Sequence, residues 1–310
     1  MRSTIYPPVI MGLWPIAGIT STGVNAETSR QAIETAIDMG VRWFDTAYSY
    51  GFDGESDRLL GQVIAQLSSG SNESLAVIGK VGQRWDAAKQ RVIDATPATI
   101  RLDAEASLQR LGIEQFDLLM LHSVDPQVPI EESATAIAEL SQRGLAKQIG
   151  VCNVSLQELQ RFASVIPPSA VQLPLNMLQT DILQEIVPWC HQRDVAVHVY
   201  WTLMKGILAG AITRDHQFSA ADSRPKYPIY QGAARERTHR LVDRLQRLAS
   251  EYGTTVSKLS IGWTISQPGV TSALVGGKYD WQIRETAGAR PLAGEVLSKI
   301  DQAIAASVAG

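Results

Sequence analysis

Several features that would assign this chain of 310 residues to a particular class of protein are missing. It contains only two cysteines, Cys152 and Cys190, so we expect no disulfide framework, and a reducing compartment is the default. Residues 1–10 include one arginine, two prolines and no long apolar stretch, so they do not have the pattern of a signal peptide. No segment reaches the ~18 uninterrupted apolar residues of a membrane span. We therefore expect a cytoplasmic protein with no membrane partner.

The chain also lacks a strong net charge and the common nucleotide-binding and metal-binding motifs. The formal net charge of -3 gives no electrostatic reason to expect nucleic acid as a partner. Neither the GxGxxG motif of a Rossmann fold nor the GxxxxGK(S/T) motif of a P-loop occurs. There is no HExxH, and the histidines other than His122 show no metal-ligand spacing, so we expect no metal site.

Short apolar runs rich in β-branched residues alternate with longer amphipathic runs along the chain. In residues 29–39, for example, apolar side chains recur at helical spacing. The strand-like runs are continuously apolar, which is typical of a parallel sheet buried on both faces. The eight expected strands are residues 9–13, 41–44, 75–79, 116–121, 146–151, 170–173, 195–200 and 270–275. This alternation favours an α/β fold of the (β/α)8 TIM barrel type over two open sheets, with residues 1–310 as a single domain.

Two segments stand outside this alternation. Residues 215–232 lie between the seventh expected strand and a helix expected at 235–252, and they contain prolines, aromatic residues and charges with little periodicity. A long loop of this kind in a compact domain is usually either disordered or a functional lid, and we expect a cover over a cofactor or substrate. Residues 293–308 have a helical pattern, and we expect a C-terminal helix on the barrel exterior.

Four titratable residues close three successive strand-like runs. Asp45 and Tyr50 follow the second run, Lys80 ends the third, and His122 follows the fourth. In a parallel barrel the carboxyl ends of the strands meet at one face, which carries the active site. We therefore expect these four side chains to form a proton-transfer site. Two other interpretations stay open: polar residues also solvate strand ends, and Asp45 with Lys80 could be an ion pair that only braces the barrel.

The order and spacing of these residues resemble the aldo-keto reductases. Residues 45–51 carry the D-T-A-x-x-Y-G motif of that family, Lys80 ends the next strand, and Leu121-His122 ends the one after it. The similarity continues over nearly the whole chain, through Asp125-Pro126, residues 129–132, residues 149–153, Val171-Gln172, residues 200–203 and residues 275–278. The resemblance implies an NADP-dependent oxidoreductase that reduces an aldehyde or ketone, or oxidises a sugar or alcohol in the reverse direction.

Carbonyl reduction requires a hydride, which a cofactor must bring, and a proton, which the resemblance assigns to Tyr50. An unperturbed pKa of about 10 makes tyrosinate unavailable as the base of the reverse reaction at neutral pH. A lysine charge at ~4 Å and an effective dielectric of about 20 contributes ~4 kcal/mol, or up to about three pKa units. We therefore expect Lys80, held charged by Asp45, to lower the pKa of Tyr50, while neutral His122 donates to the carbonyl oxygen.

Two competing assignments concern the same residues. Tyr48 lies two positions from Tyr50, but the register of the motif selects Tyr50 as the acid. An aldolase-like barrel would use Lys80 as a Schiff base and would need it neutral. The carboxylate of Asp45 argues against that chemistry.

The resemblance also implies how NADPH (or NADP+) binds. Asn153 and Gln172 match the residues that bind the nicotinamide carboxamide, and Tyr200 matches the aromatic residue that stacks on the ring. The pyrophosphate and adenosine positions are matched by Leu203, Gly206, Gly276, Lys278, Gln282 and Glu285. Lys278 stands where the family places a basic residue near the 2′-phosphate, which favours NADPH over NADH. A solvated lysine at a helix start is the alternative interpretation.

Three positions depart from the family pattern, and all of them concern the cofactor. Cys152 replaces the serine that usually precedes the carboxamide-binding asparagine, Trp201-Thr202 replaces Ser-Pro, and Thr286 replaces an asparagine near the adenine. The four expected catalytic positions are intact.

The expected substrate pocket mixes aromatic and polar groups, so it excludes few substrates. Its members are Trp14, Ile16, Tyr48, Trp85, Ser123 and residues 215–232. A hypothesis from a different class is a regulatory or sensor subunit that binds NADPH on the same fold and turns over too slowly to matter. The chain has neither an oligomerisation extension nor a charged interaction tail to support that hypothesis.

Overall fold

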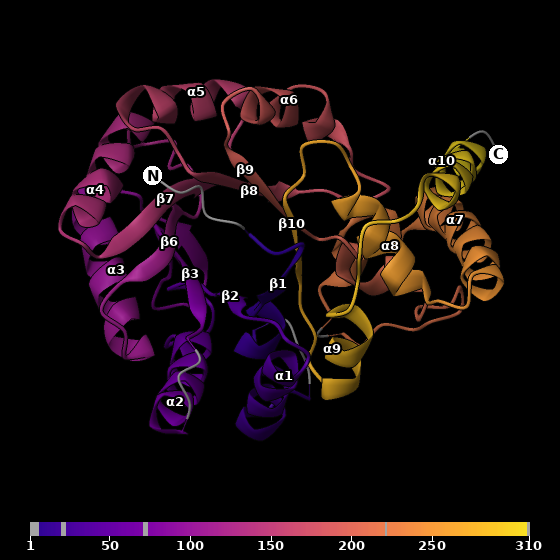
Figure 1. The fold of residues 1–310 in the computed structure, drawn as a ribbon, viewed down its shortest axis with the longest axis horizontal. Helices are drawn as coiled ribbons and strands as arrows, with labels where there is room; N and C mark the ends of the chain where they lie inside the picture. Colours follow the sequence, from indigo (N-terminus) through magenta and orange to yellow (C-terminus); the bar gives the residue numbers. More distant parts are fainter. Residues whose placement is uncertain (1–5, 20–22, 71–73, 221, 309–310) are drawn as a thin grey trace.

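The computed structural model describes residues 6–19, 23–70, 74–220 and 222–308. Eight parallel strands close into a barrel in the order β1-β10-β9-β8-β7-β6-β3-β2 (Figure 1). They are β1 (Val9–Gly12), β2 (Trp43–Asp45), β3 (Ala76–Val81), β6 (Phe116–Leu121), β7 (Ala146–Cys152), β8 (Ala170–Pro174), β9 (Ala196–Tyr200) and β10 (Ser272–Val275). The predicted (β/α)8 barrel is confirmed, and each expected strand coincides with one of these eight.

The two faces of each strand explain why the sequence runs are continuously apolar. In β6, Leu118 and Met120 pack inside the barrel with Ile78 of β3. The alternate residues Leu119 and Leu121 belong to the larger hydrophobic cluster between the strands and the surrounding helices. Because side chains of a strand alternate between its faces, burial of both faces leaves residues 118–121 without a polar side chain, whereas Asp117 is only partly buried.

Helices surround the barrel, and most follow a strand along the chain (Figure 1). They are α1 (Ala26–Asp38), α2 (Glu55–Gly70), α3 (Pro97–Leu111), α4 (Ile130–Gln142), α5 (Leu156–Val165), α6 (Ile186–His191), α7 (Gly232–Glu251), α8 (Val256–Ile265), α9 (Asp280–Thr286) and α10 (Gly294–Val308). None of the helices in the described ranges is long and apolar enough to cross a membrane.

Local sequence signals set where several of these helices begin and end. The side chain of Ser155 accepts from the backbone of Glu158, and the Glu158 carboxylate accepts from the Ser155 backbone, which closes a capping box at the start of α5. Helix α3 has Pro97 in its first turn, where a missing N–H costs nothing, and it ends at Gly112 with φ 66°.

The C-terminal helix forms outside the barrel, as predicted. Its main partner is α7, beside which α10 packs (Figure 1). Its Ile300 lies in a separate hydrophobic cluster with Leu241 of α7 and Leu259 of α8. The Asp301 carboxylate also accepts from the Trp263 indole of α8 at 2.8 Å. The apolar stripe of α10 is therefore covered by other helices and not by strands.

A small antiparallel hairpin was not predicted. It consists of β4 (Gln83–Trp85) and β5 (Arg91–Ile93), with Trp85 opposite Arg91. The turn is held by the Asp86 carboxylate, which accepts from the backbone N–H groups of Ala88 and Gln90. The hairpin follows β3 directly, so it lies at the end of the barrel where Lys80 ends its strand.

The aperiodic segment 215–232 lies over the chain that follows β9. Apart from residue 221, which lies outside the described residues, it forms two 3-10 turns, η4 (Arg224–Lys226) and η5 (Pro228–Tyr230). The Tyr230 hydroxyl donates to the carbonyl oxygens of Met204 and Lys205 at 3.0 and 3.1 Å, at the start of η3 (Met204–Ala209). The long loop predicted after the seventh strand is thus anchored on the segment that was predicted to hold a cofactor.

Candidate active site

The Lys80 ammonium is the centre of a buried cluster at the ends of β2 and β3. Its Nζ lies 2.5 Å from Asp45 Oδ1, 3.0 Å from the Thr46 carbonyl oxygen and 3.1 Å from the Tyr50 hydroxyl. An ammonium has three hydrogens to donate, so these three acceptors satisfy it completely. Lys80 is 1% exposed, which means that no water competes for its hydrogens.

In the ion pair between Lys80 and Asp45, each partner favours the charged form of the other. Burial by itself lowers the pKa of the Lys80 ammonium, but the attraction of nearby groups, above all the Asp45 carboxylate, outweighs burial and raises the pKa overall. Burial raises the pKa of the Asp45 carboxyl, which Lys80 opposes directly. Gln172 Nε2 donates to the second carboxylate oxygen, Asp45 Oδ2, at 2.8 Å. Lys80 therefore stays an ammonium, as the sequence predicted.

The ionisation of Tyr50 differs from the expectation. Burial raises the pKa of this phenol, and the Lys80 ammonium opposes the rise only in part. We expected Lys80 to bring the pKa of Tyr50 below its ordinary value, and that expectation is wrong for the chain by itself, because desolvation of the phenolate exceeds the attraction of one ammonium. Tyr50 is consequently a protonated donor at neutral pH.

His122 lies against Tyr50 and is neutral. The two rings meet edge to face with centroids 5.7 Å apart. Burial, Lys80 and Arg91 lower the pKa of His122 well below its ordinary value. Its Nδ1 has no hydrogen-bond partner among the described residues. An uncharged imidazole beside a phenol can orient an oxygen atom of a bound molecule without carrying a charge of its own.

The three residues predicted to hold a nicotinamide ring lie beside this cluster. Asn153 has φ 56° and donates from Nδ2 to the backbone oxygen of His122 at 2.8 Å. Its Oδ1 accepts from the Tyr200 hydroxyl at 2.6 Å. Gln172 contacts Asp45 through its amide nitrogen, so its amide oxygen still has acceptor capacity. The fold therefore brings the predicted catalytic residues and these three residues together from six different strands.

The more distant cofactor positions lie near the long loop. A Cβ on Gly206, which has φ 102°, would come within 3.8 Å of the Arg224 guanidinium. Burial first and then Arg224 lower the pKa of Lys278, while Asp222 opposes them. Arg224 itself is paired with Asp222 at 2.5 Å. The predicted pyrophosphate segment (Leu203 and Gly206) and the predicted 2′-phosphate lysine thus both lie near Arg224, which the sequence analysis missed inside residues 215–232.

Other residues of the adenosine end have structural contacts of their own. Gln282 Oε1 accepts from the backbone N–H groups of Lys278 and Tyr279 at 2.7 and 3.4 Å, which caps α9. A Cβ on Gly276 would lie 2.7 Å from the Gly12 carbonyl oxygen, so glycine is needed there for close packing. Glu285 is half-buried on α9. Gln282 keeps only its amide nitrogen for a bound adenine.

The predicted substrate residues divide into two groups. Trp14 meets Tyr50 edge to face at 5.2 Å, and Trp85 donates from its indole to the Ser49 backbone oxygen at 2.9 Å. Ser123 is hydrogen-bonded to the Gln83 amide next to His122. The side chains of Tyr48 and Ile16 have other contacts. The Tyr48 ring stacks with Arg84 and Arg110, and Ile16 is 2% exposed within the main hydrophobic cluster.

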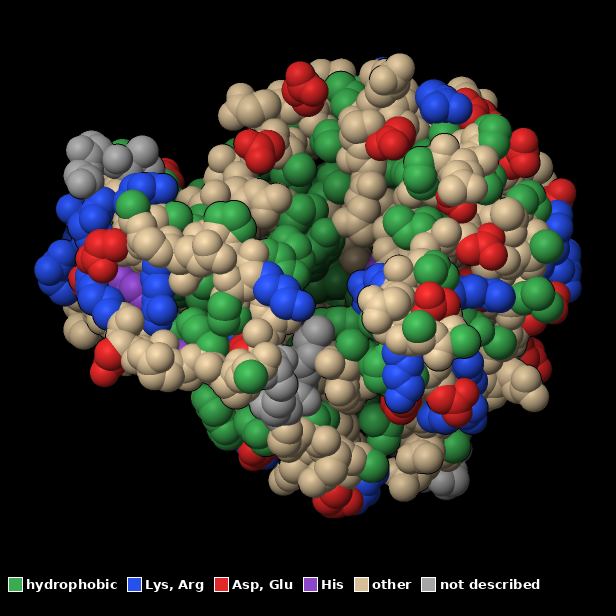
Figure 2. Space-filling view, turned by 180° about the vertical axis from the view of Figure 1, so that it is seen from behind, with side chains coloured by type: hydrophobic (Ala, Val, Ile, Leu, Met, Phe, Trp, Pro, Cys, Tyr) green, Lys and Arg blue, Asp and Glu red, His purple; other side chains and the backbone are tan. Residues whose placement is uncertain are grey.

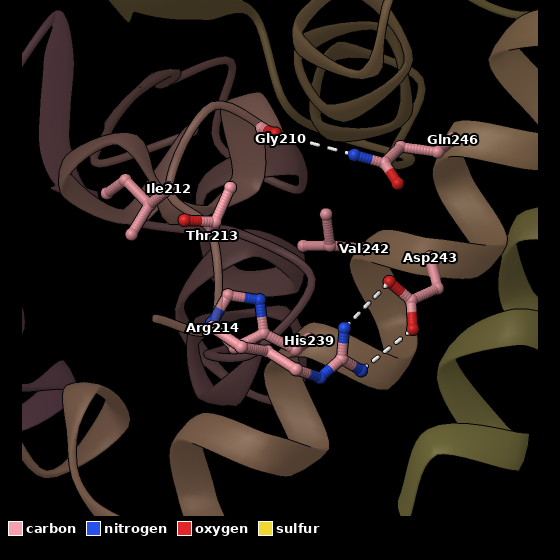
Figure 3. Close-up of a pocket in the computed structure, with 8 residues that line it drawn as sticks. All are labelled: Gly210, Ile212, Thr213, Arg214, His239, Val242, Asp243 and Gln246. Carbon is pink, nitrogen blue, oxygen red and sulfur yellow. Dashed lines mark hydrogen bonds and ion pairs between the residues drawn. The ribbon is translucent and has the colours of Figure 1, made fainter. Parts of the chain in front are cut away.

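A hollow opens at the face where the strands end. Figure 2 shows it at the centre of the barrel, lined mainly by hydrophobic side chains and with Lys and Arg side chains on its rim. A separate cavity of about 170 Å³ lies beside α7 (Figure 3). It is lined by residues that include Thr213, Arg214 and His239, and by none of the predicted site residues. No group of His, Cys, Asp and Glu side chains in the described ranges could hold a metal ion.

Comparisons with known proteins agree with this arrangement. A sequence model described as the Aldo/keto reductase family matches residues 8–305. Aldo-keto reductase YhdN of Bacillus subtilis (strain 168) is 31% identical over 274 residues, which are 88% of this chain and 82% of that protein. The NADH-specific methylglyoxal reductase of Escherichia coli (strain K12) is 30% identical over 298 residues, or 90% and 88% of the two chains.

A solved structure gives the same result. The glycerol dehydrogenase of Gluconobacter oxydans is similar to this chain with a TM-score of 0.90 and 29% sequence identity, and the match covers 100% of this chain and 95% of that one. The chain belongs to the aldo-keto reductase family.

Proposed function

We propose that this chain is an NADPH-dependent reductase of aldehydes or ketones, which in reverse oxidises a sugar or another alcohol, with Tyr50 as the general acid and base. The observation that carries this proposal is the 3.1 Å contact between Lys80 Nζ and the Tyr50 hydroxyl, within a buried ion pair. A bracing ion pair would need only Asp45 and Lys80. Here Lys80 also donates a hydrogen bond to the Tyr50 phenol, which is the group that can transfer a proton.

In the reductive direction Tyr50 donates its phenolic proton to the carbonyl oxygen of the substrate as negative charge develops there. Lys80 stabilises the phenolate that is left, because its ammonium already lies against that oxygen. Neutral His122 lies 5.7 Å from Tyr50, ring to ring, and orients the same carbonyl oxygen by a hydrogen bond. Asp45 does not contact the substrate and acts by holding Lys80.

In the oxidative direction the Tyr50 phenolate accepts the proton of the alcohol. The raised pKa of Tyr50 makes that phenolate scarce, so this direction depends more strongly on Lys80 than reduction does. Alkaline pH should favour it for the same reason.

The residues present fit a nicotinamide dinucleotide. When bound, NADPH supplies the hydride that no amino-acid side chain can supply. The amide oxygen of Gln172 and the remaining hydrogen-bonding capacity of the Asn153 amide suit a carboxamide. Tyr200 is held beside them by its hydrogen bond to Asn153. Leu203 and Gly206 would hold the pyrophosphate, while Gly276, Lys278, Gln282 and Glu285 would meet the adenosine end.

The preference for NADPH over NADH rests on charge. Lys278 forms no ion pair with a carboxylate in the described ranges, and Arg224 lies near enough to lower its pKa. Because Arg224 is already paired with Asp222, Lys278 is the cation that would bind a 2′-phosphate. One relative is described as specific for NADH, and another, from Schizosaccharomyces pombe (strain 972 / ATCC 24843), carries NADP(+) in its name. Relatives therefore do not decide between the cofactors, and Lys278 is the reason for choosing NADPH.

A single panel tests the proposal. Oxidation of NADPH and of NADH is followed with small aldehydes, ketones and sugars, and reduction of NADP+ and NAD+ with sugars and alcohols. We expect carbonyl-dependent oxidation of NADPH. If both cofactors bind in a fluorescence titration but no compound in the panel turns over, the chain is a nucleotide-binding regulatory subunit and not a reductase.

A further inference from the structure

We propose that Arg91 is a specificity-determining residue that binds an anionic group, a carboxylate or a phosphate, on the carbonyl substrate. This inference rests on the proposed function and names a class of substrate for it. It starts from the unpredicted hairpin of β4 and β5, which carries Arg91 to the end of the barrel that holds Tyr50 and His122.

The guanidinium of Arg91 is held between two indole rings. Its Cζ lies 4.6 Å from the ring centroid of Trp14 and 4.9 Å from that of Trp85. Contacts of this kind fix the plane of a guanidinium while leaving its N–H groups free at the edges. Trp14 in turn contacts Tyr50 at 5.2 Å, so one aromatic ring separates the cation from the proton donor.

No carboxylate in the described ranges neutralises Arg91. The neighbouring arginine on the hairpin, Arg84, is paired with Asp103 at 2.6 Å, and Arg110 lies 3.9 Å from Asp53. Arg91 has neither an ion pair nor a side-chain hydrogen bond with any described residue. Its two contacts supply position but no charge, so its five donors are available to a ligand.

Arg91 is an exposed residue at the end of the barrel that holds the site. Its contact with Trp14, whose ring meets Tyr50, places the guanidinium on the side of the hairpin nearest the site. Its charge also lowers the pKa of His122. Figure 2 shows Lys and Arg side chains at the rim of the hollow on this face.

A substrate fits these positions if its carbonyl oxygen meets Tyr50 and His122 while an anionic group a few bonds away meets Arg91. A planar guanidinium binds carboxylate and phosphate oxygens with two parallel hydrogen bonds. The indoles of Trp14 and Trp85 hold the guanidinium in position for that contact. Uncharged carbonyl compounds would still be reduced, but without this contribution.

The test compares matched substrates in the complete protein. Butanal and 4-oxobutanoate differ by a carboxylate, and glyceraldehyde and glyceraldehyde 3-phosphate differ by a phosphate. We expect kcat/KM to be higher for the anionic member of at least one pair, which also tells carboxylate from phosphate. Arg91→Met should reduce that advantage by about 10- to 100-fold, mainly through KM, and leave the uncharged member nearly unchanged. Arg91→Lys should retain part of it.

A matched control is available at the other end of the barrel. Arg193, in the connection before β9, also stacks on an indole, with its Cζ 4.5 Å from the ring of Trp189. Arg193→Met removes the same type of contact and should leave the ratio of the two substrates unchanged. Equal kcat/KM for charged and uncharged substrates in the wild type, or a ratio that Arg91→Met does not alter, would overturn the inference while leaving the reductase proposal intact.

If no carbonyl compound turns over, a binding measurement separates the anion-site proposal from the reductase proposal. Calorimetric titration with succinate, which contains no carbonyl group to reduce, should detect binding to the wild type that Arg91→Met loses. If no carbonyl compound turns over but succinate binds in this Arg91-dependent way, the reductase proposal fails and the anion site stands. If succinate binds equally to both proteins, Arg91 is not an anion site.

Discussion

Lys80 Nζ lies 3.1 Å from the Tyr50 hydroxyl, although the two residues come from different strand ends and are 30 positions apart in the chain. The contact exists because β2 and β3 are parallel neighbours whose carboxyl ends lie side by side, with Asp45 opposite Ile78 in the register. The barrel therefore turns a sequence pattern of separate polar residues into one hydrogen-bonded cluster.

Replacing Lys80 by methionine should impair both directions of the reaction, and alcohol oxidation more than carbonyl reduction. Oxidation needs the Tyr50 phenolate, whose pKa burial already raises, and Lys80 is the cation that stabilises it. General acid and base contributions are about 10²- to 10⁴-fold, and we expect losses of oxidative kcat in that range. Initial rates in both directions with saturating cofactor measure the difference.

Controls are needed because Lys80→Met leaves the buried Asp45 carboxylate without its cation, which costs about 3–5 kcal/mol of stability. The double variant Asp45→Asn/Lys80→Met removes that charge and should recover much of the stability but none of the oxidative activity. In the wild type, borohydride with substrate and without cofactor should leave the protein mass unchanged. A stable adduct would point instead to Schiff-base chemistry at Lys80.

The stability of the protein should fall in acid partly because of His198. This residue is 0% exposed on β9, neither ring nitrogen has a partner among the described residues, and burial lowers its pKa to about 3. In the unfolded chain its pKa is about 6.5. Because the folded pKa is the lower one, the unfolded state binds the extra proton, and stability that is present above about pH 6.5 is lost progressively as the pH falls.

The size of this effect follows from the shift. Between pH 6.5 and pH 5 the loss is about 2 kcal/mol at about 1.4 kcal/mol per pH unit. His198→Phe keeps an aromatic ring against Tyr6, whose centroid lies 4.5 Å away, and removes the titration. Urea unfolding of both proteins from pH 7 to pH 5 isolates the contribution of His198. Asp57 and Asp103, with pKa values raised to about 6, titrate in both proteins, so their effect cancels in the comparison. Parallel pH profiles would assign the acid sensitivity to other groups.

Cofactor choice should depend on Lys278. Lys278→Met is expected to weaken NADPH by about 10- to 150-fold, as for the loss of one charge-assisted contact, and hardly to affect NADH, which lacks the 2′-phosphate. Fluorescence titration of both cofactors measures this. Lys147→Met, which removes an exposed lysine paired with Asp117 at 2.7 Å at the start of β7, is the control and should change neither. Equal losses for both cofactors would mean that Lys278 is structural.

Much of the fold could be predicted because the strands of a parallel barrel are buried on both faces and therefore appear in the sequence as continuous apolar runs. All eight strands were found this way, and the residues that close β2, β3 and β6 meet as expected. The β4–β5 hairpin was missed because its strands are three residues long, and β5 is exposed throughout, so neither gives a periodic signal. Its cue was local: Asp86 at a position where its carboxylate can hold a turn.

Contacts between distant segments were the other part that sequence reasoning could not reach. Arg91 and Arg224 are ordinary arginines in the sequence, and only the folded chain shows that one is unpaired between two indoles while the other is paired with Asp222. The pKa of Tyr50 was misjudged for a related reason. The attraction of Lys80 could be calculated from one assumed distance, whereas the opposing cost of burial depends on the whole surrounding of the phenol.

The assignment of Tyr50 as the proton donor is tested by two single-atom changes. Tyr50→Phe should lower kcat for carbonyl reduction by about 10²- to 10⁴-fold and leave NADPH binding nearly intact, because the ring and its contacts with Trp14 and His122 survive while the proton is lost. Tyr48→Phe should be mild, because that ring stacks with Arg84 and Arg110, whereas the Lys80 ammonium contacts the Tyr50 hydroxyl. Steady-state rates with one aldehyde, together with a cofactor titration, compare the two variants. Tyr50→Phe with most of its activity, or Tyr48→Phe as the inactive variant, would show that Tyr50 does not donate the proton.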